Sequence, residues 1–142
     1  MTVSFFGHKH ISEQEKIAAD LEIALRNLIS EGAVTFLLGG YGDFDLLAAL
    51  VVLRLKKEFP QIRSTIVLPY LNRSFDTNLY DESIYPPLEN VPPRFAILRR
   101  NKWMVDHSDV IVSYVRHQMG GADTALRYAE RKKKKILYLG RH

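Results

Sequence analysis

The sequence of 142 residues contains no cysteine and a single tryptophan. Without cysteine, disulfides, thiolate metal ligands and cysteine nucleophiles are excluded. No apolar run is long enough to cross a bilayer. The start of the chain, Met1–Phe6, also lacks the basic segment and the apolar length of a signal peptide. These absences predict a cytoplasmic protein that does not associate with membranes.

Two common phosphate-binding signatures are missing as well. The chain has no G-x-x-x-x-G-K-[ST] segment and no G-x-G-x-x-G segment. P-loop kinases, GTPases and dinucleotide-dependent dehydrogenases are therefore unsupported. His8, His10 and His107 do not form a convincing metal motif, so neither a metal nor a cofactor is expected.

Apolar runs and amphipathic segments alternate along the chain. Strands are expected at residues 2–7, 34–38, 62–68, 109–115 and 136–139, and helices at 12–32, 43–58, 93–106 and 123–133. Such alternation predicts one α/β domain over residues 1–142, with a mainly parallel central sheet of about five strands between helices. A short additional strand is expected at 83–85.

Helix ends are predicted from local side chains. Ser12 and Glu15 have the spacing of a capping box. Asp43 is expected to cap the second helix, and Asp123 or Thr124 the last one.

The second helix, residues 43–58, is apolar almost all round. It is expected to be buried, with only residues near its end, from 54 onward, in solvent. Together with Trp103, this helix makes a homodimer plausible. The irregular segment 72–93 is long for a compact domain and is expected to serve a function, although its role is open.

Glycines follow three predicted strands, at Gly7-His8, Gly39-Gly40 and Gly120-Gly121. Because the carboxyl ends of parallel strands meet at one sheet edge, these turns should share a crevice. The latter two also precede helices, whose amino-terminal N–H groups and dipoles attract anions. The alternative is that the glycines serve only to change the chain direction.

Several side chains near this edge have two interpretations. Asp45 is either a ribose ligand or acid–base group, or a first-turn carboxylate stabilised by the helix dipole. Arg100 either binds a phosphate or carboxylate, or forms a surface ion pair with Asp106 or Glu89. Asn101 either reaches a ligand or ties down backbone, and Tyr41 either stacks on a base or covers the turn.

Positive charge is concentrated in the run Arg131–Lys135. Such a run either attracts nucleic acid or is the solvated end of a helix, where cations suit the dipole. The second interpretation is preferred, so nucleic acid is not an expected partner.

The ordered motifs resemble a known family. They are Gly7-His8-Lys9, the segment Gly39-Gly40-Tyr41-Gly42-Asp43-Phe44-Asp45, the segment 100–109 (RNKWMVDHSD), and Gly120-Gly121-Ala122 followed by Tyr128-Ala129. In this order and spacing the chain resembles the YpsA-like branch of the SLOG superfamily, named for the DprA/Smf and LOG proteins. The resemblance covers nearly the whole chain. It implies a Rossmann-like fold that binds nucleotides or nucleotide-derived ligands.

The resemblance also implies an alternative activity. The LOG relatives are phosphoribohydrolases that cleave the N-glycosidic bond of nucleoside monophosphates, with a catalytic glutamate in PGG-x-GT-x-x-E. Here the glutamate position falls on Leu46, and Asp45 is the carboxylate that remains if the chain is an enzyme. The leading prediction is therefore binding or sensing of a nucleotide-derived small molecule, with hydrolysis as the alternative. The predicted ligand-binding residues are Gly7, His8, Gly39, Gly40, Tyr41, Gly42, Asp45, Arg100, Asn101, Gly120, Gly121 and Ala122.

Overall fold

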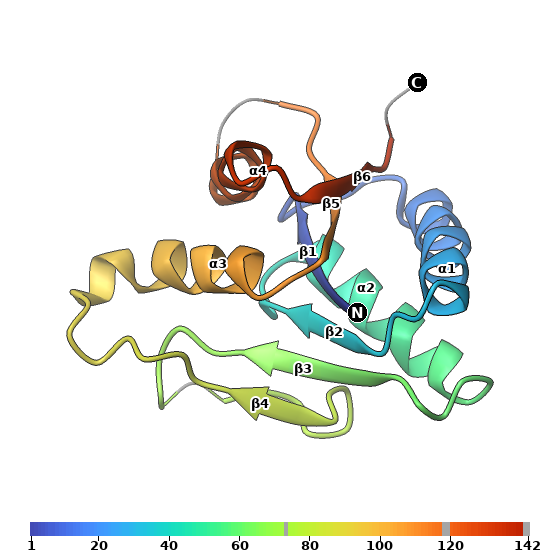
Figure 1. Ribbon diagram of the computed structural model, residues 1–142, viewed down its shortest axis with the longest axis horizontal. Coiled ribbons are helices and arrows are strands. Elements are labelled where there is room, and N and C mark those ends of the chain that lie inside the picture. The colour runs from blue at the N-terminus through green and yellow to red at the C-terminus, as the bar shows by residue number, and fades with distance from the viewer. Residues whose placement is uncertain (73, 118–119, 141–142) are drawn as a thin grey trace.

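The computed structural model describes residues 1–72, 74–117 and 120–140. Within these ranges, six strands form one parallel sheet in the order β4-β3-β2-β1-β5-β6 (Figure 1). The strands are β1 (Thr2–Gly7), β2 (Thr35–Leu38), β3 (Arg63–Val67), β4 (Glu82–Ile84), β5 (Val110–Tyr114) and β6 (Lys135–Tyr138). The helices are α1 (Gln14–Ser30), α2 (Asp43–Lys56), the 3-10 turn η1 (Pro93–Phe95), α3 (Ala96–Asp106) and α4 (Gly121–Arg131).

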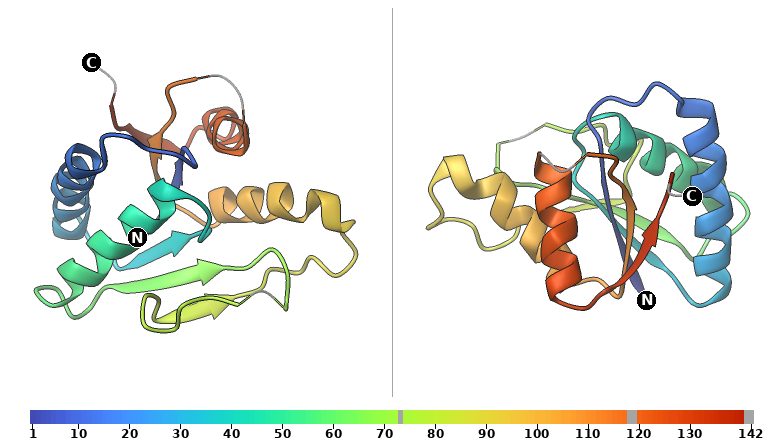
Figure 2. Two further views of the ribbon diagram at one scale, coloured as in Figure 1. Left: turned by 180° about the vertical axis from the view of Figure 1, so that it is seen from behind. Right: turned by 90° about the horizontal axis from the view of Figure 1, so that it is seen from above.

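The predicted α/β, Rossmann-like fold is confirmed. Helices α1 and α2 cover one face of the sheet, and α3 and α4 cover the other (Figures 1 and 2). Side chains of β1 alternate between these layers, because successive residues of a strand point to opposite faces. Val3 and Phe5 join the core under α1 and α2, whereas Phe6 packs with Met104 and Val105 of α3.

Strand β1 lies where the order of the sheet reverses. It pairs with β2 on one side and with β5 on the other, so that Gly7 lies beside Tyr114. In open parallel sheets this reversal opens a crevice beyond the carboxyl ends of the strands. The residues just after Gly7 therefore lie at this crevice.

The predicted helix caps are wrong. Helix α1 begins after Glu13, and no side chain caps it, so Ser12 and Glu15 do not form a capping box. Gly42 and Gly120 are the N-cap residues of α2 and α4, with φ of 93° and 103°. Glycine accepts these angles without strain, which lets the chain enter each helix by a sharp backbone turn in place of a side-chain cap.

Helix α2 is also less buried than predicted. Leu46, Leu50 and Leu53 are 48%, 47% and 39% exposed. They form a single stripe, because their spacing of four and three residues places them on one helix face. In the described part of the chain, no helix is long and apolar enough to cross a membrane.

The segment between β3 and β4 is fastened by Asp81. Its carboxylate accepts hydrogen bonds from Lys56 of α2 and from the Ser64 N–H at 2.8 Å. The Asp81 N–H in turn donates to the Ser64 carbonyl at 3.0 Å. These bonds fix the start of β4 and the preceding loop against β3 and α2.

Candidate ligand-binding site

A cavity of about 430 Å³ opens at the carboxyl edge of the sheet, beside β1, where the strand order reverses. Ten of the twelve predicted site residues line it, with Gly40 and Gly42 as the exceptions. Its walls are Phe5, Phe6, Gly7, His8, Lys9, Gly39, Tyr41, Asp45, Ile97, Arg100, Asn101, His117, Gly120, Gly121 and Ala122. Four segments of the chain therefore converge here: three follow β1, β2 and β5, and the fourth belongs to helix α3.

The glycine turn after β2 is held by two side chains. Asp45 is 8% exposed, and its Oδ2 accepts a hydrogen bond from the Tyr41 N–H at 3.0 Å. Arg100 donates from Nη1 to the carbonyls of Gly39 at 3.0 Å and Val67 at 2.9 Å. A Cβ at position 39 would lie 3.1 Å from the guanidinium carbon, so glycine there lets Arg100 approach the backbone.

Arg100 is buried, being 3% exposed, so the alternative of a surface ion pair is wrong. Its Nε donates to the Asn101 side-chain oxygen at 2.8 Å. Asn101 also lines the cavity. Arg100 and Asn101 thus both lie at the cavity, where Arg100 adds positive charge and links the ends of β2 and β3.

The two helix amino termini are not equivalent. At α2, the N–H groups of Asp43 and Phe44 donate to the carbonyls of Lys9 at 2.8 Å and His8 at 3.3 Å. The loop after β1 therefore accepts the hydrogen bonds of these two N–H groups. The sequence had predicted an anion site at this helix end. The carboxylate of Asp43 accepts the Ile11 N–H at 2.9 Å, outside its predicted role as a cap.

Helix α4 presents an open amino terminus. Among the described residues, no acceptor is bonded to the N–H groups of Gly121, Ala122 and Asp123. Gly121 has no positive φ, and within the described chain nothing lies within 4 Å of a Cβ placed on it. The fold itself therefore does not require glycine at this position, which faces the cavity.

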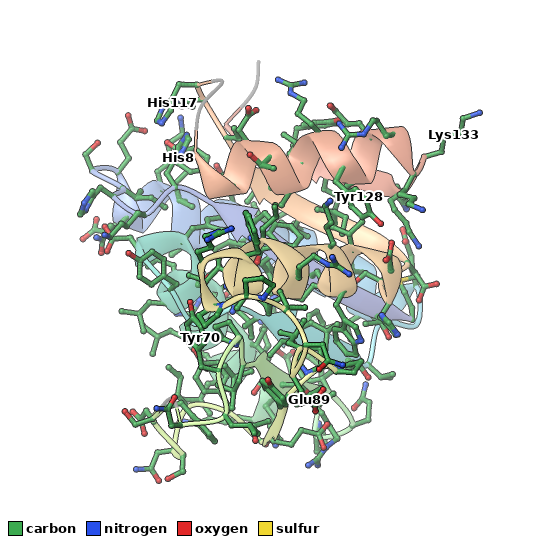
Figure 3. All side chains as sticks on the ribbon, turned by 90° about the vertical axis from the view of Figure 1, so that its left-hand side faces the viewer. His8, Tyr70, Glu89, His117, Tyr128 and Lys133 are labelled. Atoms are coloured by element: carbon green, nitrogen blue, oxygen red, sulfur yellow. The ribbon has the colours of Figure 1, made fainter. Side chains whose placement is uncertain are left out.

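Two histidines stand at the same rim (Figure 3). The rings of His8 and His117 stack with centroids 4.0 Å apart, and His8 Nε2 accepts the Arg116 N–H at 2.7 Å. Burial, followed by the nearby His117 and Arg116, lowers the pKa of His8, while Asp123 opposes this shift. The lowered pKa favours neutral His8, whose Nε2 accepts the Arg116 N–H.

A second cavity, of about 370 Å³, lies on the other side of the glycine turn. Gly40 and Gly42 line it, so the structure separates them from the other ten predicted residues. Its remaining walls are Asp43, Leu46, Ile66, Ser74, Phe75, Asp76, Leu79 and Tyr80. Part of the segment 72–93 therefore forms a cavity wall.

The basic run lies away from both cavities. Figure 3 shows His8 and His117 at one end of α4 and Lys133 at the other. Lys135 pairs with Glu31, and Lys132 lies 5.5 Å from the Tyr128 ring. Among the described residues, no group of three or more histidine, aspartate or glutamate side chains is placed to hold a metal ion.

Sequence reasoning missed Lys9 and His117. Lys9 Nζ lies 4.9 Å from the centroid of the Tyr41 ring, and both residues line the first cavity. His117 comes shortly after β5, which ends at Tyr114, whereas His8 directly follows β1. His117 belongs to none of the family motifs, so the sequence carried no signal for it.

Fold and cavity together define a Rossmann-like protein with a cavity at the carboxyl edge of its sheet. The family model YpsA, described as the YspA SLOG family, matches residues 1–88, and the chain belongs to this family. The match includes the turns after β1 and β2 but ends before α3 and α4. No curated protein matches the chain.

Solved structures share this fold at low sequence identity. One is DNA processing protein A from Helicobacter pylori, described for its single-stranded DNA binding mode. It is 19% identical with a TM-score of 0.69, and the match covers 100% of this chain and 66% of the Helicobacter pylori chain. The Streptococcus pneumoniae protein of the same name is 17% identical with a TM-score of 0.70, and the coverages are 96% and 49%. The molybdenum cofactor carrier protein from Chlamydomonas reinhardtii is 18% identical with a TM-score of 0.59, covering 98% and 76%. The chain thus spans about two thirds of the Helicobacter pylori protein and about half of the Streptococcus pneumoniae protein.

Proposed function

We propose that the chain binds a nucleotide or nucleotide-derived ligand in the first cavity, with a phosphate at the amino terminus of α4. The open N–H groups of Gly121, Ala122 and Asp123 carry this proposal. Such groups, combined with the positive end of the helix dipole, form a ready site for a phosphate. Glycine at position 121 leaves room for the ligand to reach them.

The charge around the cavity supports an anionic ligand. Lys9 and Arg100 bring positive charge to its lining, opposed by the carboxylate of Asp45 in the lining and by that of Asp123 in the first turn of α4. A phosphate beside His8 and His117 would favour their protonated forms, since an opposite charge within a few ångströms raises a histidine pKa. Proteins with this fold include a molybdenum cofactor carrier and a DNA processing protein that binds single-stranded DNA, which supports a nucleotide-derived ligand.

A thermal-shift screen against nucleotides, nucleotide sugars and ADP-ribose tests the proposal. A ligand at about one hundred times its dissociation constant should stabilise the protein by about 2.7 kcal/mol. Gly121→Val places a side chain in the open space and should abolish the shift. Its melting temperature without ligand should stay close to wild type, because the described structure has nothing there to clash with.

A matched pair of charge variants localises the site. Lys9→Gln should weaken binding, whereas Lys133→Gln, at the far end of α4, should leave it unchanged. Equal losses in both variants would point to a general effect of net charge and would contradict the site. No shift with any compound would contradict the proposal as a whole.

The position of Asp45 supports one alternative, hydrolysis of an N-glycosidic bond. Its carboxylate lines the first cavity, whereas Leu46, at the position of the LOG glutamate, lines the second. Mass analysis of each ligand after incubation would reveal a released base. Asp45→Asn keeps an oxygen that can accept the Tyr41 N–H, so loss of release in this variant would assign the chemistry to the carboxylate. Binding without release would exclude this alternative for the ligand tested.

A further inference from the structure

The outer face of α2 carries a regular apolar stripe with a charge at each end. Leu46, Leu50 and Leu53 are exposed and are spaced by four and three residues. The same alternating spacing continues to Asp43 in the first turn of the helix and to Lys57 at its carboxyl end. Residues spaced in this way lie along one side of a helix. These five residues, the α2 seam, therefore run from a carboxylate through three leucines to an ammonium group.

The opposite face of α2 is already covered by the domain itself. Its buried residues, Phe44, Ala48, Val51, Val52 and Leu55, belong to the core under α1 and α2. In the view from behind, α2 lies in front of the sheet with α1 beside it (Figure 2, left). The core therefore does not require leucine along the seam. Contiguous exposed apolar residues of this kind mark a contact with another molecule, whereas scattered single ones do not.

The apolar surface continues from α2 onto the neighbouring loop. Leu46 shares the lining of the second cavity with Phe75 and Leu79. The ion pair between Lys56 and Asp81 holds the end of this loop against α2. A standard interface buries about 800 Å² on each partner, which is more than one short helix face supplies. The contact is therefore expected to include the loop and to form reversibly.

The charges at the two ends of the seam select a second copy of this chain as the partner. Asp43 and Lys57 lie equally far from Leu50 in the sequence. A two-fold axis near Leu50 would thus bring each Asp43 toward Lys57 of the partner subunit, in the self-complementary manner of a symmetric dimer. Parallel helices would bring like charges together. The antiparallel arrangement also places the positive end of each helix dipole near the negative end of the other.

We propose that the α2 seam is the interface of a two-fold symmetric homodimer in which the two α2 helices pack antiparallel. The three leucines of each copy meet around the axis, and the charged ends of the seam set the orientation. None of the five seam residues lines the first cavity. The dimer therefore does not depend on the ligand proposed for that cavity.

Sedimentation equilibrium over a range of protein concentrations tests the dimer. The wild-type chain should change from monomer to dimer as its concentration rises. Leu50→Glu replaces two leucines at the axis by two carboxylates and should raise the dissociation constant about one hundredfold or more. Phe95→Glu changes an exposed apolar residue next to α3, in the layer on the other side of the sheet, and should have no effect. Circular dichroism and melting temperatures verify that both variants fold.

Lys57→Glu tests the antiparallel orientation. It places a carboxylate beside Asp43 of the partner subunit at both ends of the interface. The dissociation constant should rise by at least about fivefold, and the effect should shrink at high salt. Lys133→Glu makes the same change of charge at the far end of α4 and should leave the dissociation constant unchanged. Equal effects of the two variants would contradict this orientation.

The absence of cysteine from the chain allows the contact to be located by a single introduced thiol. A short bismaleimide should join two copies of Leu50→Cys, whose thiols would lie near the axis. Arg99→Cys, on the exposed side of α3, should remain uncrosslinked.

Three outcomes would overturn the proposal. They are a wild-type chain that stays monomeric at every concentration, a dimer that persists in Leu50→Glu, and crosslinking through Arg99→Cys as readily as through Leu50→Cys. The last two would place the contact on another surface. None of the three bears on the phosphate site of the first cavity, which ligands test separately.

Discussion

At the scale of single residues, the guanidinium of Arg100 acts as a fastener for two strand ends. It is buried and donates hydrogen bonds to the carbonyls of Gly39 and Val67 and to the side chain of Asn101. The planar group can serve several acceptors at once, whereas the ammonium of lysine is a compact point charge on a flexible stem. Its charge faces the first cavity, and its hydrogen bonds set the position of the glycine turn.

Arg100→Lys should therefore destabilise the protein although the charge is conserved. The loss of hydrogen bonds to buried carbonyls is expected to lower the free energy of unfolding by about 1–3 kcal/mol. Urea denaturation measures the change, with Arg99→Lys on the exposed side of α3 as the control. A surface substitution of that kind should fall within about 0.5 kcal/mol of wild type. Equal stability of Arg100→Lys and wild type would contradict the fastening role.

His8 is expected to make stability depend on pH. Its pKa in the folded protein is lowered by burial and then by His117 and Arg116, so the unfolded chain takes up its proton first as the pH falls. The stability that neutral His8 contributes is thus complete above the unfolded pKa, near 6.5, and is lost as the pH falls through the lower folded pKa. His8→Gln can still accept the Arg116 N–H and should show a smaller loss between about pH 7.5 and pH 5.

Melting temperatures across this pH range would show the effect. His107→Gln is the control, because the His107 ring stacks on Trp103 at the carboxyl end of α3. If His8→Gln follows the same pH dependence as wild type, another group is responsible. A bound phosphate should reduce the dependence, since it favours the protonated histidine.

At the scale of elements, Asp81 connects the loop after β3 with the body of the domain. Burial acts to raise the pKa of Asp81, but the hydrogen bonds from Lys56 and the Ser64 N–H outweigh it, and the pKa lies below its usual range. The stabilisation is therefore present above the unfolded pKa of an aspartate and is lost as the pH falls through the folded pKa. The same bonds position the wall of the second cavity.

Asp81→Ala should lower the free energy of unfolding by about 1–2 kcal/mol, because it removes charge-assisted hydrogen bonds at a half-buried site. Hydrogen exchange should show faster opening of the backbone amides in β4 and residues 74–81, since edge elements open first. Asp20→Ala is the matched control. Unchanged exchange in this segment would contradict the role of Asp81 as a fastener.

At the scale of the whole molecule, periodicity was sufficient to predict the layers. Alternation of apolar runs and amphipathic segments allows few arrangements other than a parallel sheet between helices, and the structure has that arrangement. The caps could not be predicted in the same way. The chain enters α2 and α4 through glycines at positive φ, which leaves no side-chain signature at the cap. The exposed leucines of α2 were misjudged because apolar residues on every side of a helix do not show which side is covered.

The candidate site was predictable in outline for the same reason. Strand ends in a parallel sheet meet at one edge, so Gly7, Gly39 and Gly121 had to lie near one another. Which helix end is open could not be inferred, because it depends on how the loop after β1 folds back. The carbonyls of His8 and Lys9 satisfy α2, and only the three-dimensional path of that loop reveals this.

The glycine turn after β2 is fixed by hydrogen bonds to three other residues. The Asp45 carboxylate accepts the Tyr41 N–H, and Arg100 donates to the Gly39 carbonyl. The Lys9 carbonyl accepts the Asp43 N–H. A surface organised in advance has little ordering entropy to lose on association. Ligand capture at this edge should therefore be a single step, with an observed rate that rises linearly with ligand concentration and shows no plateau from a preceding rearrangement.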